Sequence, residues 1–157
     1  MDDPVFTLLA IDDDPTQLDL LRIFAGEMTF PKVEFLSAES AEKGLAMLPR
    51  HTVDMVLTDY RLPGRNGIEV LREIKEHNPL ISVVVMTAYE SAGDAVNILK
   101  QGGDDYLLKP TKKEDIEHLI LRIFEQTSVQ RENVRVDEEI GSHFDNIPII
   151  YKSNKMK

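Results

Sequence analysis

The chain has 157 residues, a formal net charge of −10 at pH 7, 42% hydrophobic residues and 29% charged residues. Those proportions are typical of a globular domain, and the length predicts a single core with a modest extension. The lack of cysteine excludes disulfides, zinc–thiolate sites and thiol nucleophiles, and the acidic balance disfavours direct binding of nucleic acid, which depends on lysine and arginine.

Short apolar runs alternate with helical patterns along the chain. In chain order we predict a strand at 6–11, a helix at 14–26, a strand at 33–36, a helix at 40–48, a strand at 53–58, a loop at 62–67, a helix at 68–78, a strand at 81–86, a helix at 92–101, a strand at 106–108 and a helix at 111–124. This fivefold alternation predicts an α/β fold, with a doubly wound five-stranded parallel sheet covered on both faces by five helices.

Polar residues follow the predicted strands at the points where the strands end. Asp12 and Asp13 follow the first strand, Asp59 the third, Thr87 the fourth and Lys109 the fifth. Because the carboxyl ends of parallel strands meet at one edge of the sheet, we expect these side chains to converge there. Carboxylates that close repel one another unless a cation neutralises them, and Mg²⁺ suits a site with few protein oxygens.

The same set of groups suits phosphoryl transfer. That reaction needs an in-line nucleophile and neutralisation of the phosphoryl oxygens, and little covalent help from the protein. A carboxylate could serve as the nucleophile, while Lys109 offers a positive charge and Thr87 a hydroxyl for the transferred group.

Motifs at these strand ends carry a family resemblance. They are AIDDD at residues 10–14, LTDYRLPGRNG at 57–67, VMTA at 85–88 and DYLLKP at 105–110. In this order and spacing they resemble the receiver domain of two-component response regulators over residues 5–125. The resemblance implies the strand order 2-1-3-4-5 of the flavodoxin-like, CheY-like fold and a signalling switch, not an enzyme, that takes a phosphoryl group from a sensor histidine kinase.

The resemblance also implies roles for matching residues at the acidic site. Asp59 would be the phosphoacceptor and Asp13 a direct Mg²⁺ ligand, while Asp12 would act on the metal mainly through water. The backbone carbonyl of Arg61 would complete the protein ligands, and Lys109 would bind the phosphoryl group.

Two further positions would report phosphorylation to the surface. Thr87 would move toward phosphorylated Asp59, and Tyr106 would change rotamer in response. Two residues depart from the common family pattern: Thr111 stands where many members carry an aromatic residue, and Gly103 where many carry alanine. These departures put the identity of the partner in question rather than the chemistry.

The pattern changes after residue 125, so we expect a receiver domain at 1–125 and a linker helix with the start of another domain at 126–157. Val129, Asn133, Val136 and Ile140 have the spacing of a short coiled-coil seam, and a solvated linker helix fits equally well. Residues 144–157 resemble the opening of the AAA+ module of nitrogen-regulation-type, sigma-54-dependent activators, with Tyr151 in place of a glycine. No Walker A motif is present.

The resemblance leads us to expect a regulator of transcription that forms a homodimer through its fourth and fifth helices or its linker. A stand-alone receiver is an alternative. A phosphatase that forms an aspartyl-phosphate is disfavoured, because its Asp-x-Asp motif is absent: Tyr60 and Arg61 follow Asp59.

No apolar run approaches the roughly 20 residues that span a membrane, and the N-terminus lacks the basic region of a signal peptide. We therefore expect a soluble, cytoplasmic protein. Its histidines have no ligand spacing and are interpreted as surface residues, namely His51, His77, His118 and His143.

Overall fold

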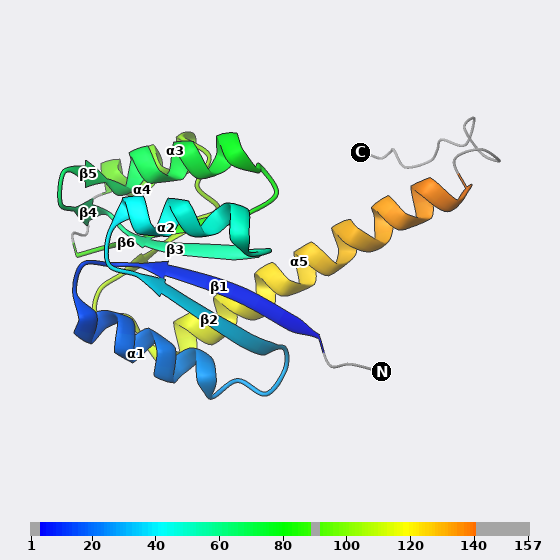
Figure 1. Ribbon diagram of the computed structural model, residues 1–157, viewed down its shortest axis with the longest axis horizontal. Helices are drawn as coiled ribbons and strands as arrows, with labels where there is room; N and C mark the ends of the chain where they lie inside the picture. The colour runs from blue at the N-terminus through cyan, green and yellow to red at the C-terminus, as the bar shows by residue number, and fades with distance from the viewer. Residues whose placement is uncertain (1–3, 89–91, 141–157) are drawn as a thin grey trace. The chain divides into compact units, whose positions relative to one another are not determined.

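The computed structural model describes residues 4–88 and 92–140. The chain divides into two compact units, Met1–Phe124 and Glu125–Lys157. The first unit holds the whole sheet, whose five parallel strands are β1 (Val5–Ile11), β2 (Lys32–Ala38), β3 (Met55–Asp59), β6 (Ser82–Thr87) and β7 (Asp105–Leu108). Their order is β2-β1-β3-β6-β7 (Figure 1), which confirms the predicted doubly wound arrangement.

Five α-helices accompany the sheet, also as predicted: α1 (Pro15–Gly26), α2 (Ala41–Met47), α3 (Gly67–His77), α4 (Ala92–Lys100) and α5 (Lys113–Ile140). Helices α1 and α5 pack on one face of the sheet, and α2, α3 and α4 on the other (Figure 1). Within the described part of the chain, no helix has both the length and the apolar character that a membrane span requires.

The central strands are apolar on both faces because helices cover both. In β1, Phe6, Leu8 and Ala10 lie in the core beneath α1 and α5, whereas Leu9 and Ile11 lie in the core beneath α2, α3 and α4. Each of these side chains is almost fully buried. Burial of one such side chain is worth up to about 1.5–3 kcal/mol, so the two cores supply most of the stabilisation that holds the strand ends in place.

The start of α1 follows its sequence signals. Asp14 is the N-cap, its side chain accepts a hydrogen bond from the backbone N–H of Thr16, and Pro15 occupies the first helical position. The helix therefore begins directly after the acidic pair at the end of β1, and this fixes the direction in which the chain leaves that strand.

Three local features differ from the sequence prediction. The segment expected as a loop contains an antiparallel pair, β4 (Arg61–Leu62) and β5 (Arg65–Asn66), joined by a turn in which Gly64 has φ +75°. Pro49 lies inside a 3₁₀ helix, Leu48–Arg50, rather than simply ending α2. Strand β3 begins at Met55 rather than at residue 53, and the side chain of the preceding Asp54 accepts from the Thr7 N–H at 2.8 Å.

The last residue of the first unit is held by aromatic contacts. The ring of Phe124 on α5 lies edge-on to Phe6 of β1, with centroids 6.3 Å apart, and edge-on to Phe30 in the α1–β2 loop at 5.6 Å. Edge-to-face pairs at such distances are favourable beyond their buried area. They fasten this part of α5 to the end of β1 that is remote from the acidic pair.

Candidate functional site

The predicted site residues meet at the carboxyl edge of the sheet. Asp12 and Asp13 follow β1, and Asp59 ends the neighbouring strand β3. One carboxylate oxygen from each of the three lies within 4.8 Å of the others. Asp12 is buried, Asp59 is half-buried and Asp13 is exposed. The site is therefore a cluster of three carboxylates, called the acidic pocket below, whose Asp13 side is exposed to solvent.

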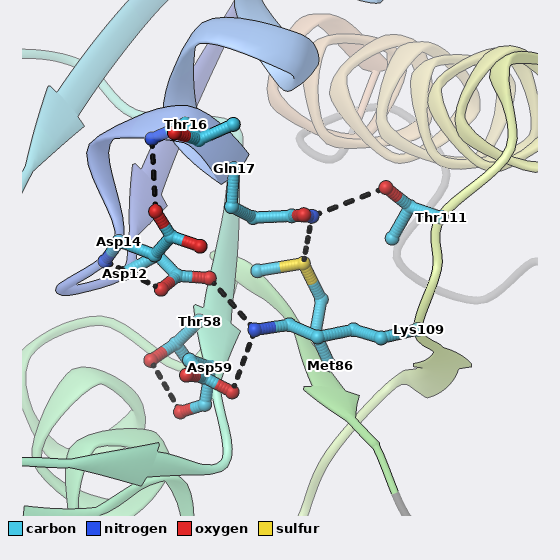
Figure 2. A network of polar contacts seen from close by, with 9 residues as sticks. All are labelled: Asp12, Asp14, Thr16, Gln17, Thr58, Asp59, Met86, Lys109 and Thr111. Carbon is cyan, nitrogen blue, oxygen red and sulfur yellow. Dashed lines mark hydrogen bonds and ion pairs between the residues drawn. The ribbon is translucent and has the colours of Figure 1, made fainter.

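Lys109 closes the pocket from the β7 side (Figure 2). Its Nζ atom lies 3.0 Å from Asp12 Oδ2 and 3.2 Å from Asp59 Oδ1. Burial alone lowers the pKa of the ammonium group, but the hydrogen bonds and charges of Asp12 and Asp59 outweigh burial and raise it. The lysine is thus held in its charged form between the two carboxylates.

The pKa of the Asp59 carboxyl is raised above its ordinary value. Burial is the largest cause, and the negative charge of Asp12 adds to it. The charge and hydrogen bond of Lys109 and a hydrogen bond from the backbone of Arg61 lower the pKa and offset part of the rise. The backbone N–H of Arg61 therefore lies beside the Asp59 carboxylate, while the expected role of the Arg61 carbonyl as a metal ligand stays a prediction.

Asp12 is the most constrained of the acidic residues. Its side chain has no exposed surface; Oδ1 accepts from the Asp14 N–H at 2.9 Å and Oδ2 accepts from Lys109. Its own N–H donates to the carbonyl of Ala38. These contacts fix the carboxylate between the β1–α1 turn and Lys109.

Thr87 and Tyr106 lie beside the pocket on the face covered by α4. Thr87 is buried at the end of β6, and its carbonyl accepts from the Lys109 N–H at 2.8 Å. Tyr106 pairs with Val85 in the ladder and packs into the core beneath α2, α3 and α4. Val85, the ladder partner of Tyr106, belongs to the same core, and Thr87 lies two residues after Val85 on β6. Thr87 and Tyr106 therefore point to the same side of the sheet.

Two structural supports of the pocket were not predicted from the sequence. Gly67 begins α3 directly against the backbone of Asp59 and Tyr60, and its N–H donates to the Tyr60 carbonyl at 2.6 Å. The side chain of Gln17 on α1 lies beside Met86 and donates to Thr111 at 3.1 Å (Figure 2). The glycine before a helical pattern was a recognisable signal, whereas nothing in the sequence connects Gln17 with Thr111.

A five-stranded doubly wound sheet with an acidic pocket and a lysine at its carboxyl edge defines a receiver-like α/β protein. The response regulator receiver domain family matches residues 8–121, so this chain belongs to that family. The resemblance identified from the motifs is thereby confirmed. Receiver domains are signalling domains of two-component systems rather than classical enzymes, and they generally bind Mg²⁺ at an acidic pocket such as the one formed here by Asp12, Asp13 and Asp59.

Curated relatives include nitrogen-regulation-type proteins. The response regulator protein PilR of Pseudomonas aeruginosa is 31% identical over 132 residues, which cover 84% of this chain and 29% of PilR. The DNA-binding transcriptional regulator NtrC of Salmonella typhimurium is 35% identical over 101 residues, covering 63% of this chain and 22% of NtrC. The chain thus spans less than a third of the length of these relatives.

Solved structures agree with this assignment. The crystal structure of a response regulator receiver domain protein from Clostridium thermocellum superposes with a TM-score of 0.70 at 28% identity. The match covers 80% of this chain and 98% of that structure, so the shared part is the receiver unit itself.

Proposed function

We propose that this domain is a phosphorylation-activated switch in which Asp59 accepts a phosphoryl group from a sensor histidine kinase. The observation that carries the proposal is the position of Asp59 at the end of the central strand β3, 3.2 Å from the Lys109 ammonium group and within the cluster of Asp12 and Asp13. The Asp59 side chain is 13% exposed, which leaves one side open to a donor.

In the transfer, a carboxylate oxygen of Asp59 forms a bond to phosphorus while the bond from phosphorus to the donor's imidazole nitrogen breaks. The electron pair of the broken bond stays on that nitrogen, and the carboxylate requires no proton removal because it reacts in its ionised form. Lys109, already charged and beside Asp59, exchanges its contact with the carboxylate for one with a phosphoryl oxygen.

Asp12, Asp13 and Asp59 would hold Mg²⁺ together with the backbone carbonyl of Arg61. The donor set fits this ion because it consists of hard carboxylate oxygens within 4.8 Å of one another, with exposed Asp13 leaving room for water. When bound, the ion supplies positive charge that neutralises the carboxylates and the phosphoryl oxygens. Asp12 is already fixed by Asp14 and Lys109, so its contribution to the ion would be made chiefly through water.

Thr87 and Tyr106 would report phosphorylation to the surface. A phosphoryl group can shift a two-state protein only through contacts that differ between its states. The Thr87 hydroxyl, at the carboxyl end of β6, is the candidate for such a contact, and a shift of Thr87 would change the space available to Tyr106 on the same face. The ladder between β6 and β7 gives this change a direct route to the surface near α4.

The output would be regulation of transcription through a further domain. PilR and NtrC are regulators, and this chain matches less than a third of each. We infer that residues 1–125 form the receiver and that residues 126–157 form a linker leading into an AAA+ module. Helix α5 continues to Ile140, which suits a linker, whereas residues 141–157 with their AAA+-like motif lie outside the described residues. The side chains of the possible seam at residues 129–140 likewise lie outside the described set.

Labelling with acetyl phosphate and Mg²⁺, read by intact mass, tests the phosphoacceptor. Wild type should gain one phosphoryl group and Asp59→Asn none. Stoichiometric labelling of the Asn variant would assign the reaction to another residue. Continuous hydrolysis of excess acetyl phosphate would favour a phosphatase over a switch, because a switch should lose its label slowly.

Sedimentation tests the output. Beryllofluoride should shift the association state of wild type, either through the surface of α4 and α5 or through the linker, and leave Asp59→Asn unchanged. A monomer under both conditions would favour the stand-alone receiver.

We also expect this domain to act in the cytoplasm without contacting nucleic acid directly, in keeping with its net charge of −10.

A further inference from the structure

The side chain of Gln17 connects three elements that surround the pocket. Its Nε2 atom donates to Thr111 Oγ1 at 3.1 Å and lies 3.6 Å from the sulfur of Met86 (Figure 2). Gln17 belongs to α1, which follows the acidic pair; Met86 belongs to β6; and Thr111 lies between β7 and α5. The half-buried amide group of Gln17 thus contacts both the strand next to Asp59 and the loop that follows Lys109.

The contact with Thr111 bears on Lys109 through the chain. Thr111 is two residues beyond Lys109, and Pro110 between them restricts the backbone. On its other side, the Lys109 N–H donates to the Thr87 carbonyl at 2.8 Å. The backbone that carries Lys109 is therefore fastened at one end to β6 and at the other to α1.

The contact with Met86 bears on Asp59. Met86 is fully buried, is the ladder partner of Asp59, and accepts the Tyr60 N–H at its carbonyl at 2.7 Å. Thioether sulfur is a weak acceptor, so the second Gln17 contact contributes packing more than hydrogen-bond energy. Gln17 therefore links β6, which pairs with Asp59, to the loop that carries Lys109.

The hydrogen bond from Gln17 satisfies a buried hydroxyl group on Thr111. Thr111 is 6% exposed, and a buried hydroxyl left without a partner costs more free energy than its hydrogen bond contributes. An apolar residue at this position would have packed here without directional contact. The hydroxyl instead places the loop at one distance from α1.

We propose that Gln17 is a positioning residue: through its hydrogen bond to Thr111 it sets the place of Lys109, and so the affinity of the pocket for the phosphoryl group. The inference rests on the proposed function, because it assigns to Lys109 the binding of a phosphoryl oxygen. Gln17 contributes no carboxylate to the acidic cluster. Its substitution can therefore change phosphoryl binding by Lys109 without removing a Mg²⁺ ligand.

The test measures beryllofluoride affinity at saturating Mg²⁺, with Mg²⁺ affinity measured separately. Gln17→Met keeps an unbranched side chain but removes the donor, and Thr111→Val keeps the shape but removes the acceptor. Each should weaken beryllofluoride binding by about threefold to tenfold, the change expected for loss of one net hydrogen bond, and leave Mg²⁺ affinity unchanged. Thr111→Ser keeps the hydroxyl and should bind beryllofluoride as tightly as wild type. The matched control is Gln101→Met, which removes the contact of Gln101 with Arg72 and should not alter beryllofluoride affinity.

A background lacking the lysine separates positioning from general stability. If Gln17 acts through Lys109, Gln17→Met should cause no further loss of beryllofluoride binding in a Lys109→Ala chain. The double variant Gln17→Met with Thr111→Val should be no weaker than either single variant, because both remove the same bond. Additive losses in either comparison, or wild-type affinity in Gln17→Met, would overturn the positioning role while leaving Asp59 as phosphoacceptor. A wild-type chain that binds no beryllofluoride would overturn the proposed function and this inference together.

Discussion

Gly67 lies so close to Asp59 that a Cβ atom added at Gly67 would stand 2.9 Å from the Asp59 carbonyl oxygen. The same atom would be 3.0 Å from Tyr60 Cα. Both neighbours are backbone atoms of the segment that carries the proposed phosphoacceptor, so neither can turn away as a flexible side chain could. The start of α3 and the end of β3 are therefore packed at backbone contact.

We expect Gly67→Ala to displace the Asp59 backbone or the first turn of α3. Overpacking of this kind costs about 1–3 kcal/mol of unfolding free energy, and the acetyl phosphate reaction should slow as Asp59 moves relative to Lys109. Urea unfolding and the labelling rate measure the two effects. Gly26→Ala is the matched control, because apart from its chain neighbours and its own helix backbone nothing lies within 4 Å of the added methyl group. Equal behaviour of the two variants would show that the contact at Gly67 relaxes without consequence.

Because the pKa of Asp59 is raised, replacing its carboxyl group should stabilise the fold, and the size of this gain should depend on pH. Burial, the largest cause, makes the folded chain hold a proton that the unfolded chain has already released, so ionising Asp59 lowers stability as pH rises between the two pKa values. Asp59→Asn should therefore be more stable than wild type at neutral pH, because the uncharged amide removes the cost of burying a carboxylate. The gain should shrink as pH falls toward about 4, where the carboxyl is protonated in the unfolded chain as well.

Urea unfolding in EDTA across that pH range checks this expectation. A less stable Asn variant at neutral pH would mean that the attraction of Lys109 for Asp59 outweighs the cost of burying the carboxylate.

Removal of Lys109 should lower stability, because the carboxylates of the acidic pocket then repel one another without a neutralising charge. Lys109→Ala leaves the fully buried Asp12 carboxylate without its ammonium partner, which we expect to cost about 1–3 kcal/mol because the lysine itself is partly solvated. Added Mg²⁺ should stabilise this variant more than wild type, since the ion supplies the missing positive charge. The comparison is made by thermal unfolding with EDTA and with Mg²⁺. Lys113→Ala, which removes surface ion pairs with Glu27 and Glu117, should change stability by less than about 1 kcal/mol. A Mg²⁺ response equal to that of wild type would argue against a metal at these carboxylates.

A second lysine should affect stability without affecting chemistry. Lys75 Nζ donates to the Ile81 carbonyl at 2.7 Å and to Asp104 Oδ2 at 2.9 Å, and the same Asp104 oxygen accepts from the Val83 N–H. These contacts hold the amino end of β6, opposite the pocket. Lys75→Met should lower the unfolding free energy by about 1–2 kcal/mol with the labelling rate of Asp59 unchanged. A labelling defect as large as that of Lys109→Ala would show that the two edges of the sheet are coupled.

The convergence of the site residues was predictable because a parallel sheet brings every strand end to one edge, and these residues are Asp12, Asp13, Asp59 and Lys109. The order of the strands was predicted from the family resemblance. The hairpin of β4 and β5 was not, since strands of two residues show no periodicity. The predicted start of β3 at residue 53 was wrong: the strand begins at Met55, although Val53 before it is also apolar and buried. The bond between Gln17 and Thr111 joins positions 94 residues apart and depends on how α1 and α5 pack on the same face. The roles of the pocket residues remain predictions that the variants above can decide.

The aromatic contacts of Phe124 have a consequence for how a signal could leave the domain. Phe124 meets Phe6 near the start of β1, whereas Asp12 and Asp13 lie just past the end of that strand. Seven residues of strand separate the two ends, a span of roughly 20 Å. Phe124 therefore lies at the opposite end of β1 from the proposed phosphoacceptor site. A change at the acidic pocket can reach Phe124 only through the elements between them, because the distance excludes direct contact.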